Sequence, residues 1–306
     1  MSDAGKARGA RELPQGVWKL VLALAAAIWG GSFVVIKDTL DAVTPAWLMA
    51  IRFVCAFVLV GFLFRRILAE HLDRRHLAAG AVLGLASGLA FVVQNVGLAD
   101  TTPGRNAFLT ATYCVMVPFV NWVVVRQRPG AKSLVAALLA IVGVGLVALG
   151  DDLSLAMSGG DWLTLVSAVL FAVHIVLVAR FSKTMDVMCL TIVQLGMSAV
   201  VAAVSALVLE PLPAAEAFAQ PSVWFSLAYL VILSSCVCMV AQNLGQAHVP
   251  PAQAGLILSL ESVFAVLASV IFYGEVVTPR LAVGFATIFA AVLVSELCGR
   301  KREDAE

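Results

Sequence analysis

The sequence predicts an all-α membrane protein whose ten transmembrane helices form a five-plus-five inverted repeat. Three observations predict this fold: the composition, ten apolar segments, and a stretch of sequence that occurs twice. Hydrophobic residues make up 61% of the 306 residues and charged residues only 13%, with a mean hydropathy of +0.99. About a quarter of the residues of a soluble domain are charged. The composition therefore excludes the soluble class.

The apolar segments are each close to the roughly 20 residues that a helix needs to cross a bilayer. They cover residues 17–36, 45–64, 77–98, 104–125, 133–150, 162–179, 187–208, 223–246, 251–273 and 281–298. The runs are continuous rather than alternating, which favours helices over a barrel. Lys6, Arg8 and Arg11 before the first run would also fit a cleaved signal peptide. Because this run has matching features in the second half, we expect a retained first helix.

One stretch of sequence occurs twice, without a gap. Residues 94–125 correspond to residues 242–273, 148 positions later, so that Gln94-Asn95 matches Gln242-Asn243. Five segments separate corresponding points, and an odd number of crossings inverts the second copy relative to the first. Inverted repeats are typical of secondary transporters, in which two similar halves surround a site near the midplane of the membrane. The repeat therefore favours a carrier.

The repeat divides the chain into two halves with short tails. We expect a cytoplasmic tail at residues 1–16, a first repeat at 17–150, an inverted second repeat at 151–298, and a second cytoplasmic tail at 299–306. Of the 20 Lys and Arg residues, 16 fall in segments on the side of the amino terminus and three, Lys37, Arg105 and Arg280, on the other side. Cytoplasmic loops are enriched in these residues. The prediction is a multi-pass protein of a bacterial inner membrane with both termini in the cytoplasm.

Two segments carry a resemblance to a known family. Residues 102–113, Thr-Pro-Gly-Arg-Asn-Ala-Phe-Leu-Thr-Ala-Thr-Tyr, followed by Pro118, resemble the fourth helix of EamA-type transporters of the drug/metabolite transporter superfamily. Residues 254–261, followed by Tyr273-Gly274-Glu275, resemble the ninth helix. Residues 28–33 and Arg52-Phe53 fit the same family, and the likeness extends from about residue 17 to residue 298. The first half departs from the pattern, because Arg126-Gln127 stands where Gly-Glu is expected, and Ser262 replaces a proline often found there.

The resemblance implies a secondary carrier of small metabolites, amino acids or amphipathic toxic compounds, more often an exporter than an importer. It also implies that the first, third, fourth, sixth, eighth and ninth segments surround the pathway. On that basis Trp29, Ser32, Thr110 and Tyr113 are candidate substrate contacts. Tryptophan and tyrosine also serve as packing or interface anchors. The alternatives are an uncoupled facilitator, a channel, a membrane enzyme and a lipid-handling protein.

The sequence contains none of the motifs that an enzyme of this size would need. It has neither a phosphate-binding Gly-x4-Gly-Lys nor a His-Glu-x2-His motif. Its six cysteines lie in apolar runs without a Cys-x-x-Cys pair, so neither disulfides nor a zinc site are indicated. We expect no catalysis, cofactor, metal or nucleic-acid partner. The expected partners are a small-molecule substrate, the bilayer and, as one hypothesis, protons, while the oligomeric state stays open.

Two charged side chains, Arg52 and Glu261, lie deep within apolar segments. A charge at the membrane centre costs about 2.5–3.5 kcal/mol on insertion scales, so neither should face lipid. Glu261 either binds a proton or a substrate amine, or serves as a structural hydrogen-bond acceptor. Arg52 is expected to be structural or to form a gating pair with a carboxylate on the outer side.

Uncharged polar residues in the segments allow similar alternatives. Gln94, Asn95, Gln242 and Asn243 occupy repeat-related positions, where they line a cavity or bond neighbouring helices. His174 either relays protons or makes a single hydrogen bond. Pro118 is expected to kink the fourth helix, and we assign Pro118, Gly274 and Glu275 structural or gating roles. A glycine stripe at Gly80, Gly84 and Gly88 predicts close packing within the chain.

Overall fold

The computed structural model describes residues 14–126, 128–148, 157–274 and 276–303, which form helices and no strands. The helices of the first half are α1 (Gln15–Thr39), α2 (Pro45–Leu63), α3 (Arg65–His71), α4 (Arg74–Ala99), α5 (Pro103–Ala111), α6 (Tyr113–Val125) and α7 (Ala131–Ala148). Those of the second half are α8 (Gly159–Phe181), α9 (Val187–Leu209), η1 (Ala215–Ala219), α10 (Pro221–Ala228), η2 (Tyr229–Val237), α11 (Cys238–His248), α12 (Pro251–Ser259), α13 (Glu261–Ala268), η3 (Ser269–Tyr273) and α14 (Pro279–Glu303).

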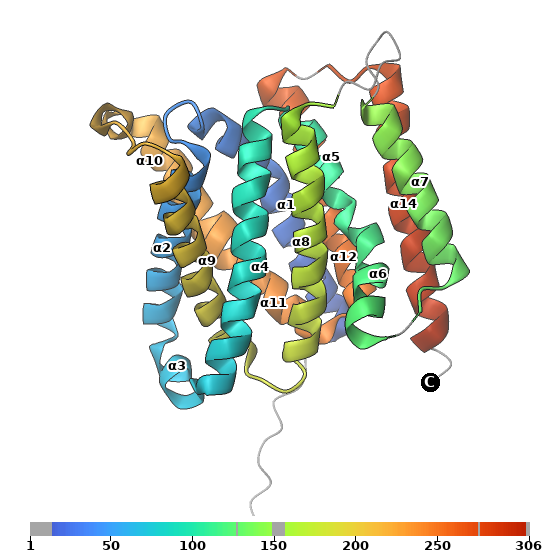
Figure 1. Ribbon diagram of the computed structural model, residues 1–306, viewed down its shortest axis with the longest axis horizontal. Coiled ribbons are helices and arrows are strands. Elements are labelled where there is room, and N and C mark those ends of the chain that lie inside the picture. The colour runs from blue at the N-terminus through green and yellow to red at the C-terminus, as the bar shows by residue number, and fades with distance from the viewer. Residues whose placement is uncertain (1–13, 127, 149–156, 275, 304–306) are drawn as a thin grey trace, which may run out of the picture.

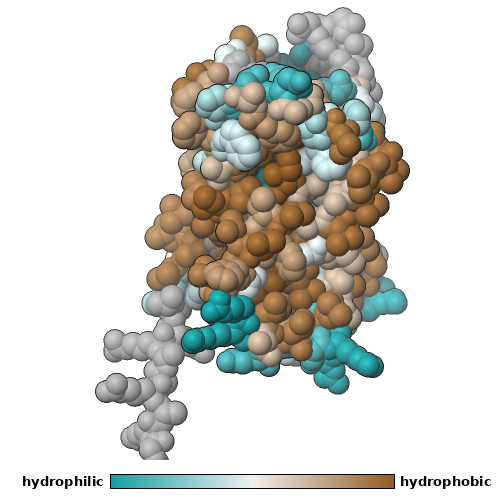
Figure 2. Space-filling view, turned by 90° about the vertical axis from the view of Figure 1, so that its left-hand side faces the viewer, coloured by the Kyte–Doolittle hydropathy of each residue, from teal (hydrophilic) through white to brown (hydrophobic). Residues whose placement is uncertain are grey.

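The helices group into the ten predicted membrane segments. In the described ranges, eight stretches are long and apolar enough to cross a bilayer, and two shorter apolar helices, Leu134–Gly143 and Pro279–Ala291, lie within α7 and α14. Several spans consist of consecutive helices: α5 with α6, α10 with η2 and α11, and α12 with α13 and η3. Figure 2 shows a hydrophobic belt between two hydrophilic ends. The predicted ten-helix membrane fold is confirmed.

The two halves pack against each other through matching helices. In the first half, α4 packs against α8 and α9 of the second half, while η2 and α11 pack against α2 and α1. Likewise α6 packs against α8, and α13 packs against α1. The fifth helices of the halves, α7 and α14, pack against each other beside the rest of the bundle (Figure 1). Each half therefore offers the other the same set of contacts, as an internal two-fold arrangement requires.

The glycine stripe packs within the chain, as the sequence predicts. A Cβ atom added at Gly80 would lie 2.7 Å from a methyl carbon of Val193 on α9, and one at Gly88 would lie 3.0 Å from the Cα of Ser198. One at Gly84 would meet the carbonyl oxygen of Gln194. Small residues let membrane helices approach this closely. The stripe thus joins α4 to α9 across the boundary between the halves.

The fourth segment of each half ends in the same backbone conformation. Gly274, which follows η3, has φ 66°, and Arg126, which follows α6 at the corresponding position, has φ 65°. This left-handed conformation is common for glycine at the end of a helix and costs other residues about 1–2 kcal/mol. The departure from the family motif at Arg126 therefore leaves the turn unchanged. Glu275 and Gln127 lie outside the described residues.

The fourth and ninth segments are each interrupted once, at repeat-related positions. The α5–α6 junction lies at Thr112 and the α12–α13 junction at Leu260, 148 positions later. At both, the amide donates to the carbonyl three residues back, at 3.3 Å and 3.2 Å. α6 runs from Tyr113 to Val125 through Pro118, so the kink at this proline stays a prediction and is separate from the interruption at Thr112. Val266 occupies the corresponding position in the second half, so proline is not the shared cause.

Candidate functional site

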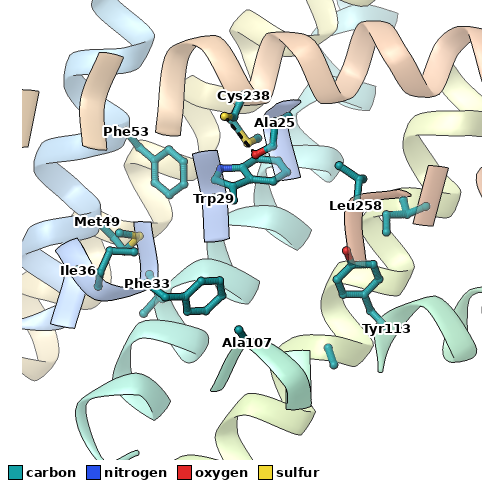
Figure 3. Close-up of a cluster of buried hydrophobic side chains, with 14 of the residues drawn as sticks. Ala25, Trp29, Phe33, Ile36, Met49, Phe53, Ala107, Tyr113, Cys238 and Leu258 are labelled. Atoms are coloured by element: carbon teal, nitrogen blue, oxygen red, sulfur yellow. Dashed lines mark hydrogen bonds between the residues drawn. The ribbon is translucent and has the colours of Figure 1, made fainter. Parts of the chain in front are cut away.

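A cavity lies between the two halves, near the middle of the helices. We call it the central cavity, and it is lined by Trp29, Ser32, Phe33, Ile36, Arg52, Phe91, Gln94, Tyr113, Phe171, Ile175, Ser234, Gln242, Leu258 and Glu261. Figure 3 shows part of its wall, where Trp29 and Phe33 of α1 lie across from Tyr113 and Leu258. The space open to the centre of a water-sized sphere is about 40 Å³. In this conformation the central cavity holds only a few waters or a small chemical group.

Both halves line the central cavity with sequence-related residues. Gln94 and Gln242 are 148 positions apart, and so are Tyr113 and Glu261. Trp29 of α1 and Phe171 of α8 are related by the offset of 142 positions that also relates the start of α2 to that of α9. The two halves therefore contribute residues from matching positions, but the side chains differ chemically. Glu261 of the second half has a carboxyl group where Tyr113 of the first half has a phenol.

Glu261 is the carboxyl group of this cavity. It is the first residue of α13, directly after the interruption at Leu260, and its side chain is 7% exposed. Its carboxyl group lies beside the phenol of Tyr113, which is the first residue after the matching interruption at Thr112. The two interruptions thus place a phenol and a carboxyl group together. α1 approaches this point closely because Gly30 has no side chain, and a Cβ there would lie 2.7 Å from the Glu261 carbonyl oxygen.

Arg52 reaches the central cavity from α2 and is 2% exposed. Its Nε donates to Ser235 Oγ at 3.1 Å and its Nη2 to Ser234 Oγ at 2.9 Å. Both serines lie in η2, a π-helical turn within the eighth segment. In this turn the Cys238 amide donates to the carbonyl five residues back, at Leu233. The Ser234 carbonyl oxygen accepts from Trp29 Nε1 at 2.8 Å.

Four of the predicted site residues lie beside the cavity rather than on its wall. Thr110 accepts a hydrogen bond from Gln94 Nε2 at 3.0 Å and so orients that amide, and Asn95 donates to the Phe91 carbonyl at 2.7 Å. His174 and Asn243 instead meet at Gln194 of α9. There Asn243 Nδ2 donates to Gln194 Oε1 at 2.8 Å, and Gln194 Nε2 lies 2.9 Å from His174 Nε2. This buried polar network joins α8, α9 and α11, and Ser87 extends it to α4.

Several residues of the wall are not among the site residues predicted from the sequence. Ser234 and Ser235 look like ordinary small residues in an apolar run, and only the π-helical turn shows that they face Arg52. The aromatic residues Phe91 and Phe171 also line the cavity, with ring centroids 4.9 Å apart in an edge-to-face contact. Phe171 is the repeat counterpart of Trp29, 142 positions later. The duplicated stretch is offset by 148 positions, so its offset does not lead from Trp29 to Phe171.

Each end of the bundle has a hollow, and the two hollows differ in size. We call the side predicted to be cytoplasmic the inner side. A hollow there, the inner vestibule, offers about 800 Å³ by the same measure and is lined by Gln15, Asn121, Val124, Val176, Ala179, Arg180, Lys183 and residues 246–251. Gln242 lines the cavity and Gln246 the inner vestibule, so one helical turn of about 6 Å separates them.

At the outer side, polar contacts connect the ends of the helices, both between the halves and within the first half. Arg105 forms an ion pair with Asp161 of α8 at 2.7 Å. Lys37 Nζ donates to the carbonyl oxygens of Leu98 and Ala99 at 2.9 Å, where it satisfies the end of α4. The Glu210 carboxylate accepts from the amides of Ala46 and Trp47 at the start of α2. A hollow of about 560 Å³ by the same measure also lies on this side, lined by residues that include Thr39, Ala42 and Glu216. The described conformation therefore has a hollow at each end, and the inner one is the larger.

Comparisons with known proteins agree with this architecture. The family model described as "EamA-like transporter family" matches residues 16–149 and 158–297. Two uncharacterized transporters from Archaeoglobus fulgidus are similar. One is 29% identical over 280 residues, covering 91% of this chain and 85% of the relative. The other is 30% identical over 233 residues, covering 72% and 77%.

A protein of known crystal structure shares the fold, with a TM-score of 0.67 at 17% identity, covering 94% of this chain and 99% of the other. The family match covers both halves, and the relatives match along most of the chain. The protein is a multi-pass membrane transporter and belongs to the EamA-like transporter family of the drug/metabolite transporter superfamily.

Proposed function

We propose that this protein is a secondary active exporter of small metabolites, such as amino acids, related compounds or amphipathic toxic molecules. The substrate passes through the central cavity by alternating access. The observation that carries the proposal is the cavity itself, which both halves line and which holds a buried carboxyl group. Movement of one half against the other is the general mechanism of carriers with inverted repeats. The inner vestibule provides the approach from the side predicted to be cytoplasmic.

Glu261 is the proposed coupling site. An ionised carboxylate without a cation is costly in a nearly dry space, so Glu261 holds either a proton or a cationic group of the substrate. The two occupants exclude each other at one carboxyl group. Arrival of a proton from the outer side then releases the substrate, and arrival of substrate from the inner side releases the proton. Tyr113 donates a hydrogen bond to the ionised form.

Purified protein in proteoliposomes tests both parts of the proposal. We expect saturable counterflow of a labelled amino acid or metabolite, and accumulation driven by an imposed pH gradient. Counterflow separates a carrier from a channel, because it requires a site that alternates between the two sides. If no solute of a broad panel of amino acids, amines and drug-like cations shows counterflow, the proposed function fails.

Glu261→Gln tests the coupling. This variant keeps the size of the side chain but cannot ionise, so counterflow of a neutral solute should remain while the pH-gradient dependence disappears. Glu216→Gln removes an exposed carboxylate of η1 and is the matched control. Unchanged dependence on the pH gradient in well-folded Glu261→Gln would indicate an uncoupled facilitator. A large loss of thermal stability would indicate that Glu261 is a structural acceptor.

A further inference from the structure

Arg52 is a buried cation with no counter-ion among the residues that the structure describes. In the described part of the chain, ion pairs within 4.0 Å join Asp73 to His76 and Arg105 to Asp161, and none involves Arg52. Two of its nitrogen atoms donate to the neutral serine hydroxyls of η2, whereas the third, Nη1, lies 4.0 Å from the sulfur of Met49. The serines satisfy hydrogen-bond donors but do not compensate the charge.

A purely structural explanation of Arg52 is unsatisfactory. A guanidinium stays charged in proteins, and a buried charge is normally paired. This chain follows that rule elsewhere, because Arg105 is paired with the buried Asp161 at 2.7 Å. Arg52 instead lines the central cavity. A buried cation on the wall of a cavity, without an ion pair among the described residues, is poised for an anion that enters the cavity.

The same cavity also contains Glu261, but the two charges do not form an ion pair within 4.0 Å. Arg52 is held by η2 on one part of the wall, and Glu261 lies beside Tyr113 on another. The rest of the wall is mostly aromatic and aliphatic, with Trp29, Phe91 and Phe171 among its residues. This arrangement matches a small molecule that has an anionic group, a cationic group and an apolar body.

We propose that Arg52 binds a carboxylate of the transported molecule, so that the substrate is a small apolar zwitterion with its ammonium group at Glu261. This inference rests on the proposed function and adds an anion subsite to it. Arginine suits the role because its planar donors match a carboxylate in a bidentate manner. The hydroxyls of Ser234 and Ser235 position the guanidinium without neutralising it.

The test compares matched ligands on the full-length protein in lipid nanodiscs, with thermal stabilisation as a binding measurement that does not depend on transport. The probes are L-leucine, leucinamide, isoamylamine, isocaproate and isoamyl phosphate. Leucinamide and isoamylamine lack the carboxylate, and isocaproate lacks the ammonium group. Isoamyl phosphate also lacks the ammonium group and carries a phosphate in place of the carboxylate of isocaproate. We expect leucine to bind at least about tenfold more tightly than leucinamide, because charge-assisted hydrogen bonds are lost in the amide. Tighter binding of isoamyl phosphate than of leucine would overturn the assignment to a carboxylate.

Substitution of Arg52 completes the test. Arg52→Gln should abolish the difference between leucine and leucinamide, and Arg52→Lys should retain part of it. Arg66→Gln, at an exposed arginine of α3, is the control and should behave as the wild type. If Arg52→Gln does not fold, the wild-type ligand series decides: equal binding of leucine and leucinamide overturns the proposal, and so does the absence of binding by any carboxylate. Counterflow of a cationic amine alone would overturn the Arg52 subsite while leaving the carrier function intact.

Discussion

At the scale of single residues, the polar network around Gln194 defines what His174 can do. His174 Nε2 lies 2.9 Å from Gln194 Nε2, and because the Gln194 Oε1 accepts from Asn243, the ring nitrogen is the acceptor. Protonation of Nε2 would set two donors against each other. His174 also does not line the central cavity. The contacts favour a neutral, structural histidine over a proton relay.

We therefore predict that His174→Gln leaves the dependence of transport on the pH gradient unchanged. Glutamine keeps an acceptor for Gln194 but cannot titrate in this range. His174→Ala, in contrast, leaves a buried amide donor unpaired and should lower the free energy of unfolding by about 1–3 kcal/mol. Thermal unfolding and proteoliposome transport measure the two effects. Loss of the pH dependence in folded His174→Gln would restore the relay hypothesis.

Gly30 supports a second prediction at this scale. In Gly30→Ala the added methyl group would lie 2.7 Å from the Glu261 carbonyl oxygen and 2.9 Å from the Ala265 amide nitrogen, both of them backbone atoms. Separating α1 from α13 should cost about 1–3 kcal/mol, as overpacking generally does, and reduce transport. Gly16→Ala, on the same helix with nothing within 4 Å of the new atom, is the control for helix propensity. Equal behaviour of both variants would show that the close approach is unimportant.

The residues on the cavity wall were only partly predictable from the sequence. Because polar side chains are costly in the membrane, the sequence marks both Gln94 and Asn95 as candidate site residues. Adjacent side chains of a helix, however, point about 100° apart. Only one of them can face the cavity, and the packing of the helix decides that it is Gln94. The sequence likewise predicts His174 and Asn243 as site residues because they are polar. Their helices instead turn both side chains toward Gln194. Hydropathy alone does not give the rotation of a helix.

At the scale of elements, the predicted segments agree with the helices, whereas their internal breaks could not be predicted. The third segment, predicted at residues 77–98, is α4 at Arg74–Ala99. A hydropathy window of about 19 residues averages over a single non-helical residue, so it misses Thr112 and Leu260. It also misses the π-helical turns, which depend on one inserted residue. These irregular positions are where Tyr113, Glu261 and the serines around Arg52 are placed.

We predict that the break in the fourth segment depends on Thr112 more than on Pro118. Thr112 Oγ1 donates to the Leu109 carbonyl at 2.6 Å. Thr112→Val keeps the shape but loses this bond, which should cost about 0.5–1.5 kcal/mol and lower the transport rate. Pro118→Ala restores an amide donor inside α6 and should keep transport with equal or higher thermal stability. Loss of transport in stable Pro118→Ala would instead make the proline the functional hinge.

At the scale of the whole molecule, the distribution of charge predicts the orientation in the membrane. Arg65 and Arg66 begin α3, and Arg74 and Arg75 begin α4, at the same end of the bundle as the last turns of α14 (Figure 1). If that end is cytoplasmic, an impermeant thiol reagent should label Ala156→Cys from outside intact cells and Glu70→Cys only after the membrane is opened. The reverse pattern of labelling would refute the orientation.

The pairing of Tyr113 with Glu261 has a consequence for how such a protein can arise. In a dimer of two identical inverted subunits, the same side chain must occupy both positions, so a carboxylate on one subunit always faces a second carboxylate. Joining the subunits into one chain removes this restriction, because each position can then change alone. The first half has kept a phenol where the second has an acid, and Arg52 has the neutral Gln194 as its counterpart. Broken symmetry gives a single substrate one preferred orientation in the site, which two equal halves would not provide.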